Sequence, residues 1–296
     1  MKLKVYILYA LLCIIWGTTW IVLKVSLQGT PPFLAIGLRF ILSALILWGV
    51  FFVKKEKLPT SRTALNIYFL FAAFNFIAGY ALTYWSTQFI YSNLGAILWS
   101  GFPLVIAFMA HFALPDDRLT PRKFISILIG LTGAIMIVYN GQSLGSDKAI
   151  YGILGTLTAV VAAAWPNVYL KKHRQVVNPI HLNVVAQSIA GVALLSLSLI
   201  VEQDRFMVIN WFNIGALFYL AIFGTVIAWL INIWLFDHIS VTQISYITFF
   251  PPMIAAILGW TILGEHLSSL AIVGAILVLT GAIMINFKFR RRVLEP

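Results

Sequence analysis

A block of six residues occurs twice in this chain, and the two copies lie half a chain apart. Residues 132–137 read TGAIMI, and the same letters return at residues 280–285, 148 positions later in a chain of 296 residues. The same offset relates Lys24 to Lys172, Pro31 to Pro179, Pro103 to Pro251 and Leu119 to Leu267. We therefore interpret the chain as two copies of one unit, residues 1–148 and residues 149–296.

The composition places both copies in a lipid bilayer. Hydrophobic residues make up 61% of the chain, charged residues make up 10%, and the mean hydropathy is +0.96. A soluble domain is about half apolar and about a quarter charged, so a soluble protein is excluded. The single cysteine, Cys13, leaves no intramolecular disulfide to consider.

Each copy contains five apolar segments long enough to cross a membrane. About 20 residues span the hydrocarbon core as a helix. The ten predicted spans are residues 5–26, 32–53, 65–87, 92–113, 122–140, 150–170, 181–201, 212–235, 241–262 and 268–287. Because five is odd, the second copy enters the membrane upside down relative to the first. The predicted fold is an all-α polytopic membrane protein of ten transmembrane helices in two inverted five-helix repeats, a construction of secondary transporters.

Lysine and arginine residues predict the orientation, because cytoplasmic connections carry an excess of them. Sixteen of the 20 fall on the side of the N-terminus. These are Lys2, Lys4, Lys54, Lys55, Lys57, Arg62, Arg118, Arg122, Lys123, Lys171, Lys172, Arg174, Lys288, Arg290, Arg291 and Arg292. Only Lys24, Lys148 and Arg205 fall on the opposite side, and Arg39 lies within a span. Both termini are therefore expected in the cytoplasm, and the net charge of +11 reflects topology rather than nucleic-acid binding.

The order of short motifs along the chain resembles the EamA family of the drug/metabolite transporter superfamily. The residues that carry this resemblance are Trp16-Gly17, Lys24, Arg39, Trp165, Lys171-Lys172, Pro251, Gly264-Glu265, Gly274 and Thr280-Gly281-Ala282. The first copy departs from the pattern with Asp116-Asp117 where the second has Gly264-Glu265, and Pro166 follows Trp165 where a small residue is more usual. The resemblance implies ten helices, alternating access and export or exchange of small metabolites across a bacterial cytoplasmic membrane.

Prolines and glycines inside the predicted spans are candidate kinks and hinges. A proline removes one helical hydrogen bond and frees a carbonyl one turn earlier. Pro103 and Pro251 are repeat mates near the middle of their spans, so two bends are predicted at related positions. Such bends serve packing alone or open a cavity at the bilayer midplane, where transporter sites usually lie. The candidate kinks and hinges are Gly17, Gly79, Gly101, Pro103, Pro166, Gly224, Pro251 and Pro252.

Aromatic and amide side chains gather near the middle of several spans, too deep for an interfacial belt. Aromatic walls with a few amides suit an amphipathic organic solute, although core packing is the alternative for any one residue. An intramembrane arginine is a functional candidate; Arg39 either packs against freed carbonyls or faces the cavity and attracts an anion. The candidate substrate-binding residues are Trp16, Arg39, Asn75, Tyr80, Tyr84, Trp99, Phe102, Trp165, Asn167, Trp229, Asn232 and Tyr246.

Several functions find no support in the sequence. No acidic residue lies well inside a span, which disfavours proton coupling through a buried carboxylate. There is no ATP-binding loop, no metal-ligand spacing and no credible catalytic set, so neither a cofactor nor enzymatic activity is expected. The leading function is a secondary transporter of small amphipathic metabolites such as amino acids. A transporter of sugars or nucleotide-linked solutes is the alternative, and a membrane enzyme is least favoured.

Small residues four apart predict that spans five and ten pack together in a monomer. The pairs are Gly130 with Ala134 and Ala271 with Ala275, and a dimer interface is the rival interpretation.

Overall fold

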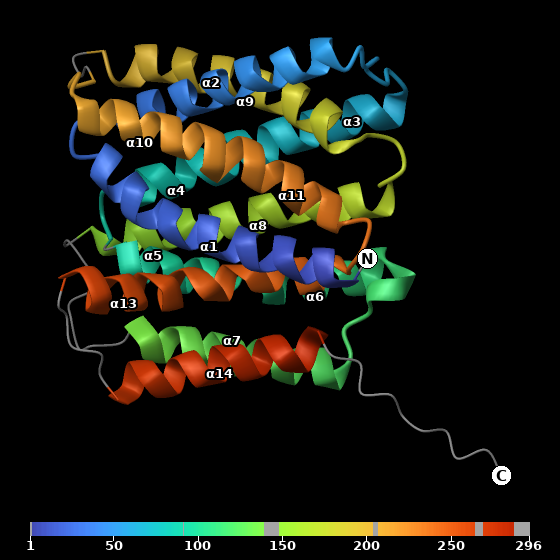
Figure 1. Ribbon diagram of the computed structural model, residues 1–296, viewed down its shortest axis with the longest axis vertical. Helices are drawn as coiled ribbons and strands as arrows, with labels where there is room; N and C mark the ends of the chain where they lie inside the picture. Colours follow the sequence, from blue (N-terminus) through green and yellow to red (C-terminus); the bar gives the residue numbers. More distant parts are fainter. Residues whose placement is uncertain (1, 91, 139–147, 204–206, 264–268, 287–296) are drawn as a thin grey trace.

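The computed structural model describes residues 2–90, 92–138, 148–203, 207–263 and 269–286, and all regular structure within them is helical (Figure 1). The prediction of an all-helical chain is therefore confirmed for these residues. The first half contains α1 (Lys2–Ser26), α2 (Pro32–Val53), α3 (Arg62–Leu70), η1 (Phe71–Gly79), α4 (Tyr80–Ser86), α5 (Ser92–Trp99), α6 (Phe102–Ala113), η2 (Pro115–Asp117) and α7 (Pro121–Val138).

The second half repeats this order of elements, apart from the place of its 3-10 segment. It contains α8 (Ala149–Lys172), α9 (Pro179–Val201), α10 (Trp211–Ala221), η3 (Ile222–Ile227), α11 (Ala228–Leu235), α12 (Val241–Ser245), η4 (Tyr246–Phe249), α13 (Phe250–Leu263) and α14 (Ser269–Asn286). The 3-10 segment η4 lies between α12 and α13, whereas η2 of the first half lies after α6, the counterpart of α13. Helix α14 begins and ends 148 residues after α7. The counterparts α1 and α8 run in opposite directions, as do α7 and α14 (Figure 1).

Six helical stretches are long and apolar enough to cross a membrane. They are Leu3–Leu23, Pro32–Val53, Arg62–Ser86, Ala149–Lys172, Pro179–Val201 and Trp211–Leu235. Two shorter apolar stretches, Ile97–Ala113 and Ser269–Ile285, accompany them. A helix rises 1.5 Å per residue, so the six longer stretches match a hydrocarbon core about 30 Å thick.

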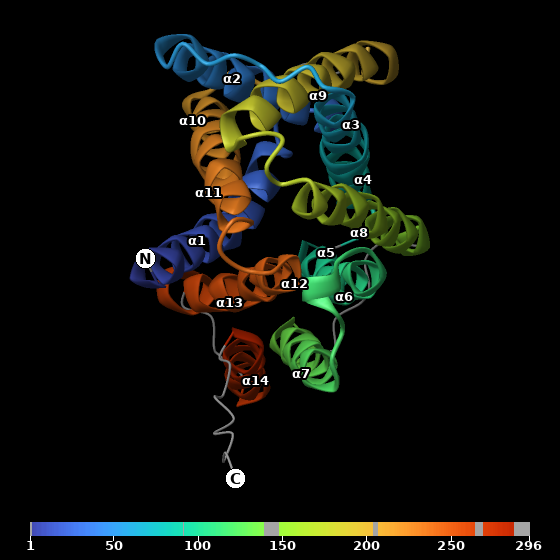
Figure 2. The same ribbon diagram turned by 90° about the vertical axis from the view of Figure 1, so that its right-hand side faces the viewer.

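The first helix of each half packs against the other half. Helix α1 contacts α10, α11 and α13, whereas α8 contacts η1, α4, α5 and α6. Helix α2 lies against its counterpart α9, on the side of the molecule opposite α7 and α14 (Figures 1 and 2). Viewed from the end that carries the N-terminus, these helices surround a common centre, and α7 and α14 lie outside them (Figure 2). The walls around the centre are therefore each built from both halves.

Helices α7 and α14 approach closely at glycines, as the small-residue spacing predicts. A Cβ atom on Gly133 would lie 2.5 Å from the carbonyl oxygen of Gly274, and a Cβ on Gly274 would lie 2.6 Å from that of Gly133. Gly133 and Gly274 are not repeat mates, and neither belongs to the small-residue pairs predicted from the sequence. The physical reason for the close packing is nevertheless the predicted one, because residues without a side chain let two helix axes approach each other.

The prolines predicted to kink spans four and nine instead begin new helices. Helix α5 ends at Trp99 and α6 begins at Phe102, so Pro103 lies in a first turn; Pro251 and Pro252 likewise lie in the first turn of α13. At such positions the missing N–H has no helical partner to lose. The helix break between α5 and α6 lies next to the one before α13. The Ser100 hydroxyl donates to the carbonyl of Thr248 at 3.4 Å, and Thr248 is the repeat mate of Ser100.

Two further irregular segments were not predicted. Each is a π-helix, η1 and η3, and each lies in the middle of an otherwise α-helical span. The candidate hinges Gly79 and Gly224 fall within them. In contrast, Pro166 lies inside the continuous helix α8, and Gly17 lies inside α1, where the side chain of Ile254 packs against it. The wide turns of the π-helices η1 and η3 free backbone groups for other partners.

Candidate functional site

A cavity of about 160 Å³ lies at the common centre of the helices. Its lining residues come from α1, α2, η1, α4, α5, α6, α8, α11, α12, η4, α13 and the connection 236–240, and none of the described lining residues comes from α7 or α14. We call this the central cavity. Among the twelve residues predicted to bind substrate, ten line it: Trp16, Arg39, Asn75, Tyr80, Tyr84, Trp99, Phe102, Asn167, Trp229 and Asn232.

The aromatic part of the lining is cross-braced. The rings of Trp16 and Trp229 meet edge to face, with centroids 5.7 Å apart. The indole Nε1 of Trp229 donates to the Tyr80 hydroxyl at 3.0 Å, and the indole Nε1 of Trp99 donates to the Thr83 hydroxyl at 3.1 Å. Because the indole N–H groups of Trp229 and Trp99 have partners, these two rings hold a fixed orientation and present apolar faces to a solute.

Arg39 is the cation of the central cavity, and its side chain reaches from α2 to η3. Its Nε donates to the Thr225 hydroxyl at 2.6 Å, one Nη donates to the Gly224 carbonyl at 2.9 Å, and the other Nη donates to the Tyr84 hydroxyl at 3.2 Å. The guanidinium also lies over the Tyr80 ring, 5.4 Å from its centroid, a cation–π distance. Gly224 permits this approach, because a Cβ there would lie 3.1 Å from Nη2.

Three asparagines supply amides to the lining. The Nδ2 of Asn167 donates to Ala163 O at 2.7 Å and to Asn75 Oδ1 at 3.0 Å. Asn75 is buried, and its own Nδ2 has no hydrogen-bond partner among the described residues. Asn232 is also buried, and its side chain makes no hydrogen bond to any other described residue. Buried polar groups are normally satisfied, so amides that find no partner among the described residues can hydrogen-bond a solute at this cavity wall.

Trp165 and Tyr246 lie away from the central cavity. Trp165 faces outward from α8 with 45% of its surface exposed, because the neighbouring positions Ala164 and Pro166 are the ones that turn inward. Tyr246 is fully buried between η4 and α7, where its hydroxyl donates to the carbonyl of Ser126. Both aromatics therefore contribute to the surface and to packing rather than to the cavity wall.

The sequence reasoning missed other residues of the lining. These are Thr19, Trp20, Leu23, Thr83, Ala163, Phe236, Val241, Ile244, Ser245 and Thr248, while Pro251 was predicted only as a hinge. One signal was available, because Thr19 is the repeat mate of Asn167 and both line the cavity. Apart from the aromatics Trp20 and Phe236, the remaining residues are small or aliphatic, and nothing in their types separates a cavity wall from an ordinary core.

The connections 54–61, 114–120, 173–178 and 236–240 lie at one end of the molecule, which we call the basic end (Figure 1). Toward this end, the wall of the central cavity is an apolar layer. Phe236, Val241 and Ile244 line the cavity and are 1%, 1% and 4% exposed. They pack with Leu12 and Leu114 in one buried cluster. Beyond this layer lies a second hollow of about 1300 Å³, the vestibule, lined by Arg122, Lys123, Lys171, Lys172, Asp116, Asp117 and Asp237 among others.

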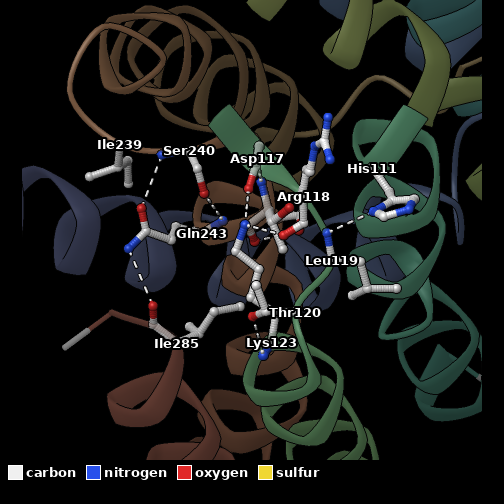
Figure 3. Close-up of polar contacts among 12 residues, drawn as sticks. His111, Asp117, Arg118, Leu119, Thr120, Lys123, Ile239, Ser240, Gln243 and Ile285 are labelled. Atoms are coloured by element: carbon white, nitrogen blue, oxygen red, sulfur yellow. Dashed lines mark hydrogen bonds and ion pairs between the residues drawn. The ribbon is translucent and has the colours of Figure 1, made fainter. Parts of the chain in front are cut away.

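A polar network ties the start of α12 to neighbouring helices beside the vestibule (Figure 3). The buried carboxylate of Asp117 accepts from Lys123 Nζ at 2.5 Å and from the backbone N–H of Thr242 at 3.0 Å. Ser240 and Gln243 form a capping box, and Gln243 also donates to the carbonyl of Ile285 at 3.3 Å. These contacts hold α12, which carries part of the apolar layer, against η2, α7 and α14.

A second set of contacts fixes the loop before α12. Lys171 Nζ donates to the carbonyls of Phe236 and Ile239, the latter at 2.9 Å. Arg174 pairs with Asp237 at 2.8 Å. Burial lowers the pKa of Arg174, and Asp237 opposes that shift. The loop that carries Phe236 is thus attached to the end of α8, which lies on the other side of the central cavity.

Comparison with known proteins places this geometry in a family. The model of the EamA-like transporter family matches the chain twice, over residues 3–139 and 150–287. The chain belongs to the EamA-like transporter family. It is a membrane transporter, and the resemblance seen in the sequence is confirmed. Groups of three or more side chains suited to a metal ion are absent from the described residues.

Relatives along almost the full length carry transporter names. The chain is 26% identical over 280 residues to the uncharacterized transporter YoaV of Bacillus subtilis, covering 94% of this chain and 95% of that one. It is 26% identical over 262 residues to the uncharacterized inner membrane transporter YedA of Escherichia coli, covering 88% and 83%. A crystal structure matches with a TM-score of 0.79 at 17% identity, covering 96% of each chain, which shows the fold alone.

Proposed function

We propose that this EamA-family transporter is a secondary carrier that moves small amphipathic organic solutes by alternating access around the central cavity. The observation that carries the proposal is a cavity near the middle of the helices, walled by braced aromatics and unpaired amides from both halves. Aromatic walls with a few polar groups suit such solutes. Export or exchange is the expected direction, because that is what the family resemblance implies.

The proposed topology has ten spans in two inverted repeats, residues 1–148 and 149–296, in a bacterial cytoplasmic membrane. The opposed directions of α1 and α8, and the helix bounds that recur after 148 residues, support this arrangement. The basic end is then the cytoplasmic end, and the protein acts as a monomer. Phosphate-bearing solutes fit less well, since Arg39 is the one cation among the described residues that line the cavity.

In the proposed mechanism, two walls rock around the solute. One consists of α1 with α10, α11 and α13, and the other of α8 with η1, α4, α5 and α6. The glycines and prolines at the helix breaks and π-helices serve as flexible points. Opening toward the cytoplasm requires the Asp117 and Lys171 contacts to release α12 and the loop before it, so that the apolar layer separates.

Thiol labelling from both membrane faces tests alternating access without knowledge of the substrate. With Cys13→Ala as background, Ser245→Cys places one nearly isosteric thiol on the cavity wall. A membrane-impermeant reagent should modify it from either face. Adding Asp117→Asn should raise the cytoplasmic rate and lower the external rate, because it weakens closure at the basic end. Rates that rise together indicate a channel, and labelling from one face only indicates a receptor; either result overturns the proposal.

A further inference from the structure

Arg39 carries a positive charge that no carboxylate of the described protein neutralises. The three ion pairs among the described residues are Lys123 with Asp117, Arg174 with Asp237 and His181 with Glu56. The Arg39 side chain is buried, 3% exposed, and its acceptors are two hydroxyls and one carbonyl, all neutral. A buried charge is costly unless it is paired, so this guanidinium favours an anion beside it.

Donors remain available around this charge. A guanidinium has five N–H groups, and three of those of Arg39 are used within the protein. The orientation of Asn75 is fixed by its neighbour: Asn167 Nδ2 also donates to Ala163 O, so the Asn75 atom that faces it is the oxygen. The Asn75 NH₂ group is therefore the unpaired end, and it lines the same cavity.

We propose that the ligand of the central cavity is a small monocarboxylate with one aromatic or similarly compact apolar body and no second charge. This inference rests on the proposed function and names its substrate class. A carboxylate accepts several hydrogen bonds through two oxygens, which matches the free N–H groups of Arg39 and Asn75. The buried amide of Asn232 completes the polar part of the wall.

The volume and the remaining lining residues of the cavity limit the size, shape and charge of the ligand. Its volume of about 160 Å³ is close to that of a protein cavity, about 150 Å³, known to take one benzene ring. Trp16, Trp99 and Trp229 present ring surfaces on several sides. Among the described lining residues there is no Asp or Glu to neutralise an ammonium group and no second cation to neutralise a dianion. Cations and phosphates are thereby disfavoured against a singly charged acid.

Ligand-induced stabilisation of the purified full-length protein tests this class. The probes share one ring and differ in charge: phenylacetate, its neutral amide, phenylalanine, phenethylamine and phenyl phosphate. Since a ligand that binds only the folded state raises its stability with concentration, phenylacetate should raise the melting temperature at the lowest concentration of the five. No stabilisation by phenylacetate up to its solubility limit, or tighter binding of any other probe, would overturn the proposal.

Substitutions in the cavity wall test whether phenylacetate binds in the central cavity. Arg39→Lys keeps the charge but loses the planar set of donors; it also breaks the contacts with η3, so its folding must be measured. Asn232→Leu removes no hydrogen bond to a described residue, so it should remain folded and weaken phenylacetate binding about tenfold or more, the usual effect of losing a hydrogen bond to a charged group. Trp165→Ala, on the outer surface, is the matched control and should bind as the wild type does. Unchanged affinity in both Arg39→Lys and Asn232→Leu would refute the site.

The outcomes separate this inference from the proposed function. If phenethylamine or the amide binds in place of phenylacetate while Ser245→Cys is still labelled reciprocally, the substrate class is wrong and the carrier stands. If phenylacetate binds as expected but the labelling comes from one face only, the site is right and alternating access is wrong.

Discussion

Replacing Gly133 with alanine should separate α7 from α14. An added Cβ would lie 2.5 Å from the oxygen of Gly274 and 2.8 Å from the backbone nitrogen of Val278. Both neighbours are backbone atoms in the middle of a helix, so no side chain can rotate away. Ordinary contact begins at 3.4 Å, and the helices must therefore move apart by roughly 0.9 Å along this line, a distance that close-packed interiors do not absorb freely.

The expected magnitude follows from two opposing terms. Overpacking of this kind costs about 1–3 kcal/mol, whereas alanine is favoured over glycine in a helix by about 0.5–1 kcal/mol. The net result is a loss between about 0 and 2.5 kcal/mol, with a middle value of about 1 kcal/mol. Gly49→Ala is the matched control, because Gly49 lies inside α2 with nothing within 4 Å of an added Cβ; it should gain about 0.5–1 kcal/mol.

Thermal unfolding of the two variants in the same detergent measures the difference. We expect the melting temperature to fall for Gly133→Ala and to hold or rise for Gly49→Ala. Gly274→Ala should behave like Gly133→Ala, since its Cβ meets the carbonyl of Gly133 at 2.6 Å. A melting temperature of Gly133→Ala equal to that of Gly49→Ala would refute the close approach of the two helices.

Further predictions concern the cavity and its closure. Trp229→Ala should abolish most ligand binding because it removes a wall and the partner of Tyr80, whereas Trp165→Ala should leave binding unchanged; equal effects in a titration would contradict the placement of the two rings. Gly224→Ala should displace the Arg39 guanidinium and weaken carboxylate binding more than neutral-ligand binding, measured as the ratio of the two dissociation constants. Asp117→Asn should lower stability by about 1–3 kcal/mol, since a buried acceptor loses its charge-assisted bonds; an unchanged melting temperature would argue against that network. Residues 1–148 expressed alone should not give a folded, monodisperse protein, because α1 finds its packing partners in the other half, and a stable purified half would contradict this.

Much of the fold could be predicted because the bilayer imposes it. The described helices coincide with the predicted segments to within a few residues, since apolar length, prolines at helix starts and flanking charges all report the same boundaries. The internal repeat gave the correspondence of elements. What it did not give was the packing of α1 and α8 against the opposite halves, which depends on tertiary contacts that no local pattern encodes.

The residue types that line the candidate site could be predicted from the sequence, but the direction in which each side chain points could not. Deep aromatics and amides marked the cavity well, and Arg39 was visible as a lone charge in an apolar span. Trp165 was misplaced because α8 is apolar on every side, so periodicity does not tell which face turns inward. The π-helices were invisible for a related reason: widening a turn depends on contacts such as that of Arg39 with Gly224, made by a residue far away in the sequence.

The apolar layer between the cavity and the basic end also affects how many ions leak through the protein when it is not transporting a solute. A continuous chain of water molecules from face to face would conduct protons, and each charge that leaks down 100 mV dissipates about 2.3 kcal/mol. Phe236, Val241 and Ile244 offer water neither donors nor acceptors, and narrow apolar constrictions tend to dry out. A resting copy of this protein should therefore leave the membrane electrically tight, so that the cell can hold many copies without draining its ion gradients.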